Sequence, residues 1–356
     1  MNLIDSMAQS PGLNAIGWTL LHFIWQGLLL AGAGALIIRL LRGRTASIRY
    51  VATCAVLAIM AMTPLVTFFL LAGPTHSTGL AAGPAAPLAP DGRMIRLADS
   101  VEDWIDRPID ESDGSDWIGS LSRTLDDSVP IVVIFWIAGI VLFSVRLTGG
   151  WLITIRWTRQ LTSEAPRELR LAVDRLRQRI GAMRAVRVLM SARLDVPCVV
   201  GWFRPVIVLP EAIMGLPPSY LSALLAHELA HIRRHDYLVN LIQCAVETLL
   251  FYHPAVWWIS SRIRAERENC CDDEAVRLCG DPFGYARALL HLETTRPSQV
   301  RLALSAADES LLSRIRRVLV AESPRPLRAG SAAPMLCAMI IILATIVPWV
   351  RRRVTR

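Results

Sequence analysis

The sequence contains no lysine, and only 19% of its residues are charged. Soluble domains carry about 25% charged residues, so this deficit, beside 53% hydrophobic residues, is typical of a membrane protein. All 38 residues counted as lysine plus arginine are therefore arginines, and the formal net charge is +8. The arginines crowd beside apolar segments, and no basic stripe is interleaved with stacking aromatics, which argues against direct nucleic-acid binding.

A disulfide framework is also missing from the chain. The seven cysteines are odd in number and follow no regular spacing, whereas disulfide frameworks use even numbers at ordered spacings. Cys54 and Cys337 lie in apolar runs that could cross a membrane. We therefore expect reduced thiols, most of them buried.

Four apolar runs approach or exceed the ~20 residues that a membrane-spanning helix needs. They cover residues 13–41, 50–72, 129–155 and 332–350. The first run is too long to be a signal peptide and lacks the cleavage motif of one. The predicted fold is an integral membrane protein, mainly α, with about four transmembrane helices.

The placement of arginine predicts the orientation of these runs, because cytoplasmic loops are rich in basic residues. Arg42, Arg44 and Arg49 follow the first run, so the loop within region 1–72 is predicted to be cytoplasmic. Segment 73–128 is rich in proline and glycine and then acidic, and we expect an extracytoplasmic, partly disordered loop. The basic tail at 351–356 conflicts with this order if the fourth run spans fully; we expect the early runs to set the topology.

Region 156–325 is the stretch expected to form a globular domain, on the cytoplasmic side between the third and fourth runs. Its pattern predicts an α+β arrangement. The expected elements are helices over 168–180, 217–232 and 260–278, and strands over 186–190, 198–201 and 205–209. The apolar run 237–263 is expected to be kinked or divided at Pro254. It either packs deep in the domain or dips into the membrane surface.

The motif H-E-x-x-H occurs in the helical stretch 217–232, as His227, Glu228 and His231. Histidines four residues apart share one helix face, so both imidazoles can bind one Zn²⁺ ion, and the glutamate can reach a metal-activated water. The alternative is a surface helix with its polar face in water. Apolar neighbours argue against that alternative, because buried imidazoles and a carboxylate need compensation, which a metal supplies.

A third zinc ligand is expected from the acidic cluster downstream. Glu268 and Asp272 share a helix face, so one can bind the metal while the other accepts an N–H from a histidine ligand. Cys270 and Cys271 are alternative ligands, since thiolates bind zinc well. Attack of a metal-activated water on a peptide carbonyl would form an oxyanion, and the candidates for stabilising it are Tyr237, Tyr252 and His253.

Four stretches of the chain resemble the BlaR/MecR-type antirepressor metallopeptidases of bacteria. They are WTLLHFIWQG at 18–27, PVIVLP at 205–210, HELAHIRRHDYLVNLIQ at 227–243 and FYHPAVWWISSRIRAERENCCDDEAV at 251–276. The layout of three spans, a cytoplasmic peptidase domain and a fourth span is similar too. The likeness covers nearly the whole chain, and the blocks around the zinc site are its most specific part.

The resemblance implies a gluzincin in the bacterial inner membrane, with its active site facing the cytoplasm. It implies that His227, His231 and Glu268 bind Zn²⁺, that Glu228 is the catalytic base, and that Asp272 supports a ligand. It also implies a protein substrate, because relatives cleave themselves, a cytoplasmic winged-helix repressor, or both. A homo-oligomer is an open option.

One departure from the resemblance concerns sensing. The sensor-transducers carry a penicillin-binding domain after the fourth span, and we expect none here because the chain stops six residues after Val350. Without lysine, the chain also cannot hold an S-x-x-K signature. Two other functions stay open, a quality-control peptidase for membrane proteins and a catalytically silent membrane sensor or scaffold.

Overall fold

The computed structural model describes seven stretches of the chain: residues 10–72, 116–160, 162–182, 184–194, 196–201, 203–294 and 305–320. Three of its helices are long and apolar enough to cross a membrane, as the sequence predicted. They are α2 (Pro11–Leu40), α3 (Ala46–Ala72) and the Ser128–Arg156 portion of α5 (Asp116–Gln160). The expected fourth run, 332–350, and residues 73–115 of the expected loop lie outside the described residues. The end of that loop, 116–128, is helical and belongs to α5.

The described residues divide into two compact units. The first comprises the N-terminal turns of α2, the C-terminal turns of α3 and the N-terminal part of α5. Within it Gly17 lies directly against Val129, leaving no room for a Cβ atom. The second unit holds residues 22–65 and the described residues from Trp136 onward, and the candidate site lies entirely within it.

A four-stranded sheet in the second unit has the order β1-β2-β4-β3. Its strands are β1 (Ser163–Glu164), β2 (Arg187–Ser191), β3 (Cys198–Val200) and β4 (Val206–Pro210). The central pair, β2 and β4, is parallel, and both outer strands pair antiparallel. The three strands expected from the sequence are present within a residue or so, whereas β1 is too short to show a periodic pattern. Strand β3 forms one edge.

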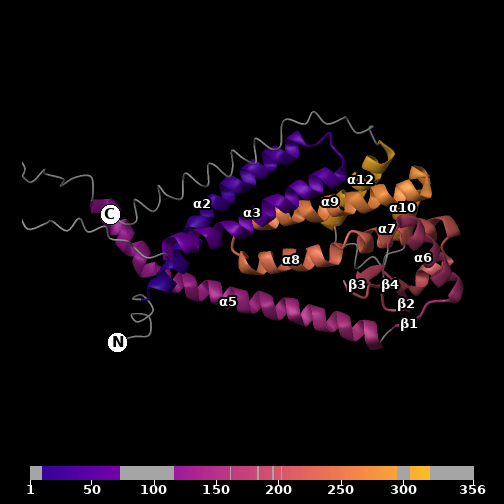
Figure 1. Cartoon of the computed structure of the whole chain (residues 1–356), viewed down its shortest axis with the longest axis horizontal. Coiled ribbons are helices and arrows are strands. Elements are labelled where there is room, and N and C mark those ends of the chain that lie inside the picture. The colour runs from indigo at the N-terminus through magenta and orange to yellow at the C-terminus, as the bar shows by residue number, and fades with distance from the viewer. Residues whose placement is uncertain are drawn as a thin grey trace, which may run out of the picture. The chain divides into compact units, whose positions relative to one another are not determined.

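Besides its parts of α2, α3 and α5, this unit holds the helices that follow β1 along the chain (Figure 1). They are α6 (Arg167–Ile180), the 3₁₀ turn η1 (Glu211–Gly215), α7 (Pro218–Arg233), α8 (Asp236–Leu249), α9 (Pro254–Cys279), α10 (Pro282–Thr294) and α12 (Ser305–Leu319). Pro254 divides the apolar run 237–263 and occupies the first turn of α9, where its missing N–H is not needed. The helix expected over 260–278 therefore begins earlier, at Pro254. Helices α10 and α12 were not predicted.

Helix α7 lies at the centre of this unit, because it is apolar on nearly every side. Leu225 and Leu229 pack with Ile207 and Leu209 of β4 and with Val173 of α6, and all are fully or almost fully buried. Cys271 of α9 joins the same core, so α7 lies between the sheet and α9. This packing holds α7 and α9, the two helices with the predicted metal ligands, side by side.

Candidate metal centre

Helix α7 presents both histidines of the motif on one face. Pro217 precedes the helix at its N-cap position, Pro218 begins it, and His227 and His231 then follow one turn apart. The centroids of their rings are 4.9 Å apart. His227 is 7% exposed, so this side of the helix is a partly enclosed cleft rather than a solvated surface.

Glu268 of α9 completes a group of three possible metal donors with the two histidines. Its Oε2 atom lies 3.4 Å from His227 Nε2, and its Oε1 atom lies 3.8 Å from His231 Nε2. Tetrahedral zinc with ligands at ~2.0–2.1 Å separates neighbouring donor atoms by roughly 3.3–3.5 Å. The donor set fits a zinc ion; the first distance lies in this range, and the second exceeds it by about 0.3 Å.

The other ring nitrogen of His227 is held from behind. Its Nδ1 atom lies 2.9 Å from the hydroxyl oxygen of Tyr285, and that hydroxyl donates a 2.7 Å hydrogen bond to Asp272 Oδ1. Asp272 Oδ1 is itself 3.3 Å from Nδ1. Because the single hydroxyl proton points to the carboxylate, Nδ1 carries a proton and donates, which leaves the Nε2 lone pair free for a metal.

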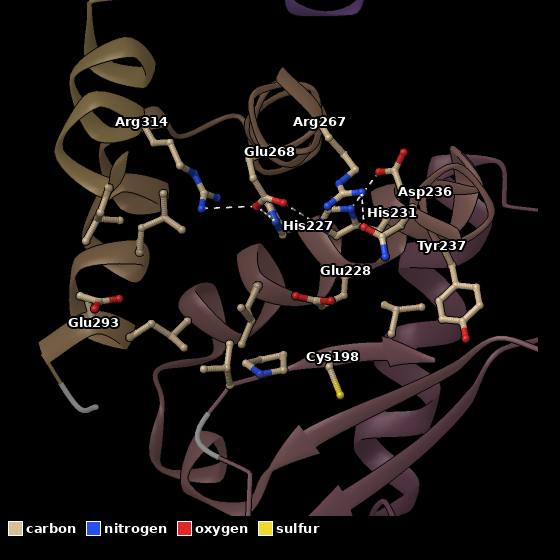
Figure 2. A pocket seen from close by; sticks show the side chains of 18 residues that line it. Cys198, His227, Glu228, His231, Asp236, Tyr237, Arg267, Glu268, Glu293 and Arg314 are labelled. Carbon is tan, nitrogen blue, oxygen red and sulfur yellow. Dashed lines mark hydrogen bonds and ion pairs between the residues drawn. The ribbon is translucent and has the colours of Figure 1, made fainter. Parts of the chain in front are cut away.

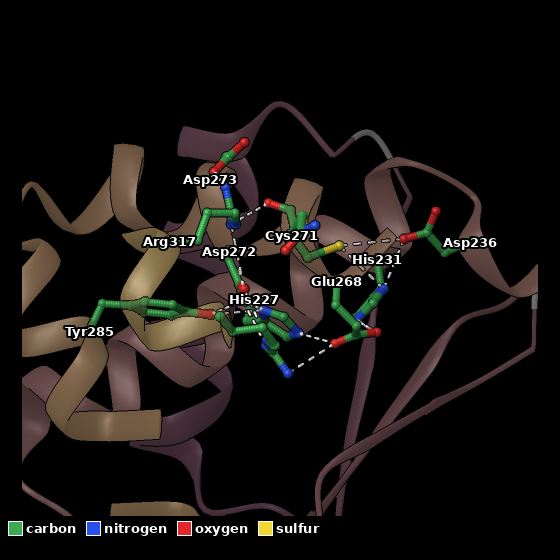
Figure 3. A network of polar contacts seen from close by, with 11 residues as sticks. His227, His231, Asp236, Glu268, Cys271, Asp272, Asp273, Tyr285 and Arg317 are labelled. Carbon is green, nitrogen blue, oxygen red and sulfur yellow. Dashed lines mark hydrogen bonds and ion pairs between the residues drawn. The ribbon is translucent and has the colours of Figure 1, made fainter. Parts of the chain in front are cut away.

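Arg314 of α12 binds the same carboxylate, which Figure 3 shows beside Tyr285 and His227. Its Nε atom donates to Asp272 Oδ2 at 2.9 Å and its Nη2 atom to Oδ1 at 2.6 Å. Its Nη1 atom lies 3.4 Å from Glu268 Oε2. Asp272 is completely buried, so this two-point contact supplies the charge that a buried carboxylate needs.

His231 is supported by a different carboxylate. Its Nδ1 atom lies 2.8 Å from Asp236 Oδ2, at the first turn of α8. The thiol of Cys271 lies 3.3 Å from the same nitrogen and 3.4 Å from the same carboxylate oxygen. With Nδ1 donating to Asp236, the Nε2 lone pair of His231 also faces the cleft.

Mutual contacts shift the pKa values of the ligands strongly in the metal-free protein. Burial opposes protonation of His227, but its hydrogen bonds to Asp272 and Glu268 outweigh burial and raise its pKa to about 10. Burial also opposes ionisation of Glu268, but the hydrogen bond from His227 and its charge prevail and lower the pKa of Glu268 to about 2. Burial is likewise overcome at Asp272, where His227 and Arg314 hold the pKa well below its usual range. In the metal-free protein, protonated His227 therefore supplies the positive charge beside Glu268 and Asp272 that a metal ion would supply in its place.

Cys271 forms a second group of possible donors with His231 and Asp236. Burial and the nearby Asp236 and Glu268 charges raise the pKa of its thiol well above the usual range. A thiol must lose its proton to bind zinc, so these surroundings disfavour a thiolate ligand. Cys270 points to another part of the core and contacts Ser47. The alternative ligation by Cys270 and Cys271 therefore lacks a common geometry.

The three possible metal donors line a cleft of about 400 Å³. Glu228 projects into it between the histidines and strand β3, where Cys198 lies opposite (Figure 2). Tyr237 also lines the cleft, so it alone of the three oxyanion candidates is near the metal group. Tyr252 and His253 lie instead at the turn between α8 and α9, where they pack on Phe23 of α2.

The sequence interpretation missed three side chains of this site: Asp236, Tyr285 and Arg314. Asp236 follows His231 closely along the chain, and an acidic residue at the start of the next helix was a readable signal. Tyr285 and Arg314 are brought in by α10 and α12, and no local pattern marks either one. Asp272, which was predicted to support a ligand, lies beside His227.

A buried and a partly buried histidine, a glutamate donor and a carboxylate behind each histidine define a metallopeptidase-like centre. Residues 36–318 match the model of the family described as BlaR1 peptidase M56, and the chain belongs to this family. The family is one of metallopeptidases, whose members use a metal, typically zinc.

Two kinds of curated relative match part of the chain. Over 159 residues it is 28% identical to "Regulatory protein BlaR1" of Bacillus licheniformis. This match covers 44% of this chain and 26% of that protein. Over 162 residues it is 19% identical to "Methicillin resistance mecR1 protein" of Staphylococcus aureus, covering 43% of this chain and 28% of that protein. The matched segment thus spans little more than a quarter of either relative.

Proposed function

We propose that the chain is a multi-pass zinc endopeptidase of the gluzincin type. In this proposal His227, His231 and Glu268 hold the zinc ion, and Glu228 is the catalytic base. Asp272 and Asp236 orient the two histidines. The observation that carries the proposal is the convergence of three donor atoms at zinc-like spacing while both Nδ1 atoms are occupied by carboxylate networks.

A zinc ion bound at this site would acidify a water molecule and polarise a peptide carbonyl. Glu228 does the proton work in the proposal. Its carboxylate faces the cleft on the same side of α7 as the histidines, so it can accept a proton from the attacking water. It can then pass this proton to the nitrogen of the departing amine. Tyr237, at the cleft wall, is the best-placed candidate for contacting the oxyanion.

The substrate is proposed to bind as an extended strand along β3. This strand is an edge of the sheet, and Cys198 and Val199 line the cleft. An unpaired edge offers backbone donors and acceptors to a peptide, which fixes the peptide in an extended form. A peptide held there would run past Glu228 and the metal donors.

The cytoplasmic placement of the site rests on the arginines of the loop between α2 and α3. Arg49, at the start of α3, bonds Glu266 of α9 at 2.8 Å, and Arg234 stacks on Tyr50 at 4.7 Å. The basic loop is therefore on the same side as the metal group, and basic loops face the cytoplasm. We accordingly propose spans in 1–72, 129–155 and 332–350, an outer loop over 73–128, a peptidase domain over 156–325 facing the cytoplasm of a bacterial inner membrane, and a basic tail at 351–356.

The substrate class in this proposal is the chain itself, a cytoplasmic transcriptional repressor, or both. The names of the relatives, a regulatory protein and a methicillin-resistance protein, favour signalling over general proteolysis. Such a chain would act on one or two partners. A quality-control peptidase would instead cleave many unfolded membrane proteins.

The test compares membranes that contain the wild-type chain, Glu228→Gln or the matched control Glu211→Gln, a change on the exposed turn η1. Each is co-expressed with a candidate repressor, and both proteins are followed by blot. We expect cleavage with wild type and Glu211→Gln, and a loss of about 10²–10⁴-fold with Glu228→Gln, because its general base is gone. Unchanged cleavage by Glu228→Gln would sink the assignment.

A further inference from the structure

Helix α8 has the reverse of the pattern that a helix shows in a soluble domain. Its buried residues are all polar: Asp236, Gln243, Glu247 and Thr248. Its exposed residues after the first turns are all apolar: Leu241, Ile242, Ala245 and Leu249. In water the apolar face of a helix packs inward, whereas in a bilayer polar groups face the protein and apolar groups face lipid.

The polar residues inside this pattern are paired with one another. Glu247 accepts hydrogen bonds from Arg264 Nη1 at 2.6 Å and from Gln243 Nε2 at 3.2 Å. The same amide of Gln243 also donates to the carbonyl oxygen of Ser260 at 3.0 Å. Ionisable groups at membrane depth are found in this state, facing a neighbouring helix and neutralised there.

The turn between α8 and α9 offers few bare backbone groups to its surroundings. Trp136 of α5 donates its indole N–H to the Leu249 carbonyl at 2.9 Å. Trp257 donates to the Phe251 carbonyl at 2.7 Å. Hydrocarbon has no water to satisfy such carbonyls, so an irregular turn is tolerated in a bilayer only when protein groups satisfy them.

His253 closes the turn in the same way. One ring nitrogen accepts the backbone N–H of Ala255 at 3.2 Å, and the other donates to the Ile24 carbonyl of α2 at 3.0 Å. Gly27 of α2 lies directly against the imidazole, so any side chain there would collide with it. Both polar ends of a fully buried histidine are thus used.

The turn contacts the middle of two membrane-spanning segments. Ile24 and Gly27 lie near the centre of the α2 span, and Gly139 and Phe143 lie near the centre of the α5 span. Gly139 lies directly against Phe251, whose ring stacks on Phe143 at 5.3 Å. The level of the turn is therefore the mid-level of the spans themselves.

Helix length agrees with this depth. From Pro254 to Arg262, the first charged residue of α9, the rise is about 12 Å at 1.5 Å per residue. Half of a hydrocarbon core is about 15 Å thick. The same arithmetic puts Glu268 about 21 Å from the turn, within or just beyond the headgroup layer.

A largely apolar cavity lies beside α8 and meets its exposed face at Leu241. It has a volume of about 1040 Å³ and lies between α5, α8 and the turn from β3 to β4, with Phe143, Trp151 and Phe203 among its lining residues. An open volume of this kind between lipid-facing helices suits acyl chains, which fill irregular apolar gaps.

We propose that residues 237–263 form a helical hairpin that enters the bilayer from the side of the metal centre, turns at mid-depth and contacts lipid acyl chains through α8. The base of the hairpin carries Asp236 and leads into the helix of Glu268. The metal centre is consequently held at the membrane surface, and a peptide must reach that surface to be cleaved.

The direct test uses the wild-type full chain in vesicles of phosphatidylethanolamine and phosphatidylglycerol, with a trace of phosphatidylcholine bearing a diazirine at the end of one acyl chain. After irradiation, mass spectrometry locates the lipid adducts. We expect adducts on α8 between Leu241 and Leu249 and, as the internal control, on Leu28 and Leu29 of α2. Phe283 of α10 and Leu312 of α12 are more exposed and apolar but should carry none. Adducts on α2 with none on α8, as when water or a second copy covers that face, would overturn the proposal.

A pair of charge substitutions tests the same face without a probe. Ile242→Asp introduces a carboxylate at a lipid-facing position and should lower the folded, membrane-integrated fraction by roughly tenfold or more. Leu312→Asp, at a similarly exposed apolar position of α12, should leave that fraction unchanged, as should the conservative Ile242→Ala. Equal tolerance of both aspartates would place α8 in water.

Discussion

His227 and His231 lie one turn apart on α7, yet their Nδ1 atoms meet unlike surroundings. Behind His227, Asp272 accepts hydrogen bonds from Tyr285 of α10 and from two nitrogens of Arg314 of α12. Behind His231, Asp236 comes from the next turn of chain and has a thiol as its additional partner. Its Oδ1 atom has no hydrogen-bond partner among the described residues, and Arg234 lies 3.6 Å away.

The difference teaches that the two halves of one metal centre depend on the fold to different extents. The His231 side is assembled by neighbouring sequence, so it forms whenever α7 and α8 form. The His227 side requires α9, α10 and α12 to meet around a buried carboxylate. Any movement of α12 would therefore act on the centre through Asp272 and Glu268, which Arg314 contacts, rather than through Asp236.

The largest expected effect is the difference in zinc affinity between variants of the two supporting carboxylates, Asp272 and Asp236. Asp272→Asn removes the charge that Arg314 and His227 share, and we expect zinc affinity to fall about 100-fold, against about tenfold for Asp236→Asn. Competition with a chromophoric chelator, using purified full chain, measures both constants. Equal losses of zinc affinity in the two variants would contradict the claim that the His227 and His231 sides of the centre differ.

The next effect tests whether α12 supports the centre. Arg314→Gln removes the closer of the two guanidinium groups at a buried carboxylate and leaves Arg317, whose Nη2 atom is 3.6 Å from Asp272 Oδ2, so zinc affinity should fall about tenfold. Arg314→Lys should restore only part of it, because an ammonium cannot make the two-point contact. Arg316→Gln, on the exposed side of the same helix, is the matched control and should bind zinc as wild type does. An Arg314→Gln chain with wild-type zinc affinity would show that α12 does not support the metal centre.

The proton on His227 should make zinc affinity depend on pH. Its pKa in the metal-free protein is raised to about 10, so below that pH zinc must displace a proton to bind. Apparent zinc affinity should therefore rise about tenfold per pH unit between pH 6 and 8. Calorimetry in buffers of different ionisation enthalpy should show at least about one proton released per zinc at pH 7. Zinc binding without proton release would contradict the raised pKa.

The smallest effect concerns the thiol behind His231. Because Cys271 is not a ligand in this account, Cys271→Ser should change zinc affinity by less than about threefold, within the range of a lost weak hydrogen bond. The chelator assay reports it, and Cys279→Ser, away from the centre, is the control. A loss as large as that of Asp236→Asn would instead make the thiol part of the metal site.

Local patterns in the sequence predicted the elements that depend on neighbouring residues. The pair His227 and His231 was readable because helical spacing alone puts them on one face, and three spans were readable from length and apolarity. Pro254 was correctly expected to divide the run 237–263, since a proline fits the first turn of a helix and not its interior.

Other features depend on tertiary packing and had no local signature. Tyr285 and Arg314 reach Asp272 only because α10 and α12 fold back over α9, and a tyrosine or arginine in a helix is not a signal by itself. The run 237–263 showed its hydrophobicity in the sequence but not which face was buried. The structure adds that Gln243 and Glu247 face inward, and this burial supports the membrane hairpin that we propose.

Zinc K-edge X-ray absorption of the purified full chain tests the central claim most directly, because the two groups of donors differ in one element. The account predicts two imidazoles with oxygen or nitrogen neighbours near 2.0–2.1 Å and no sulfur. Glu268→Gln should weaken zinc binding, while Cys271→Ser leaves the spectrum unchanged. A sulfur neighbour near 2.3 Å would place the metal on His231, Asp236 and Cys271 and would contradict the proposed centre.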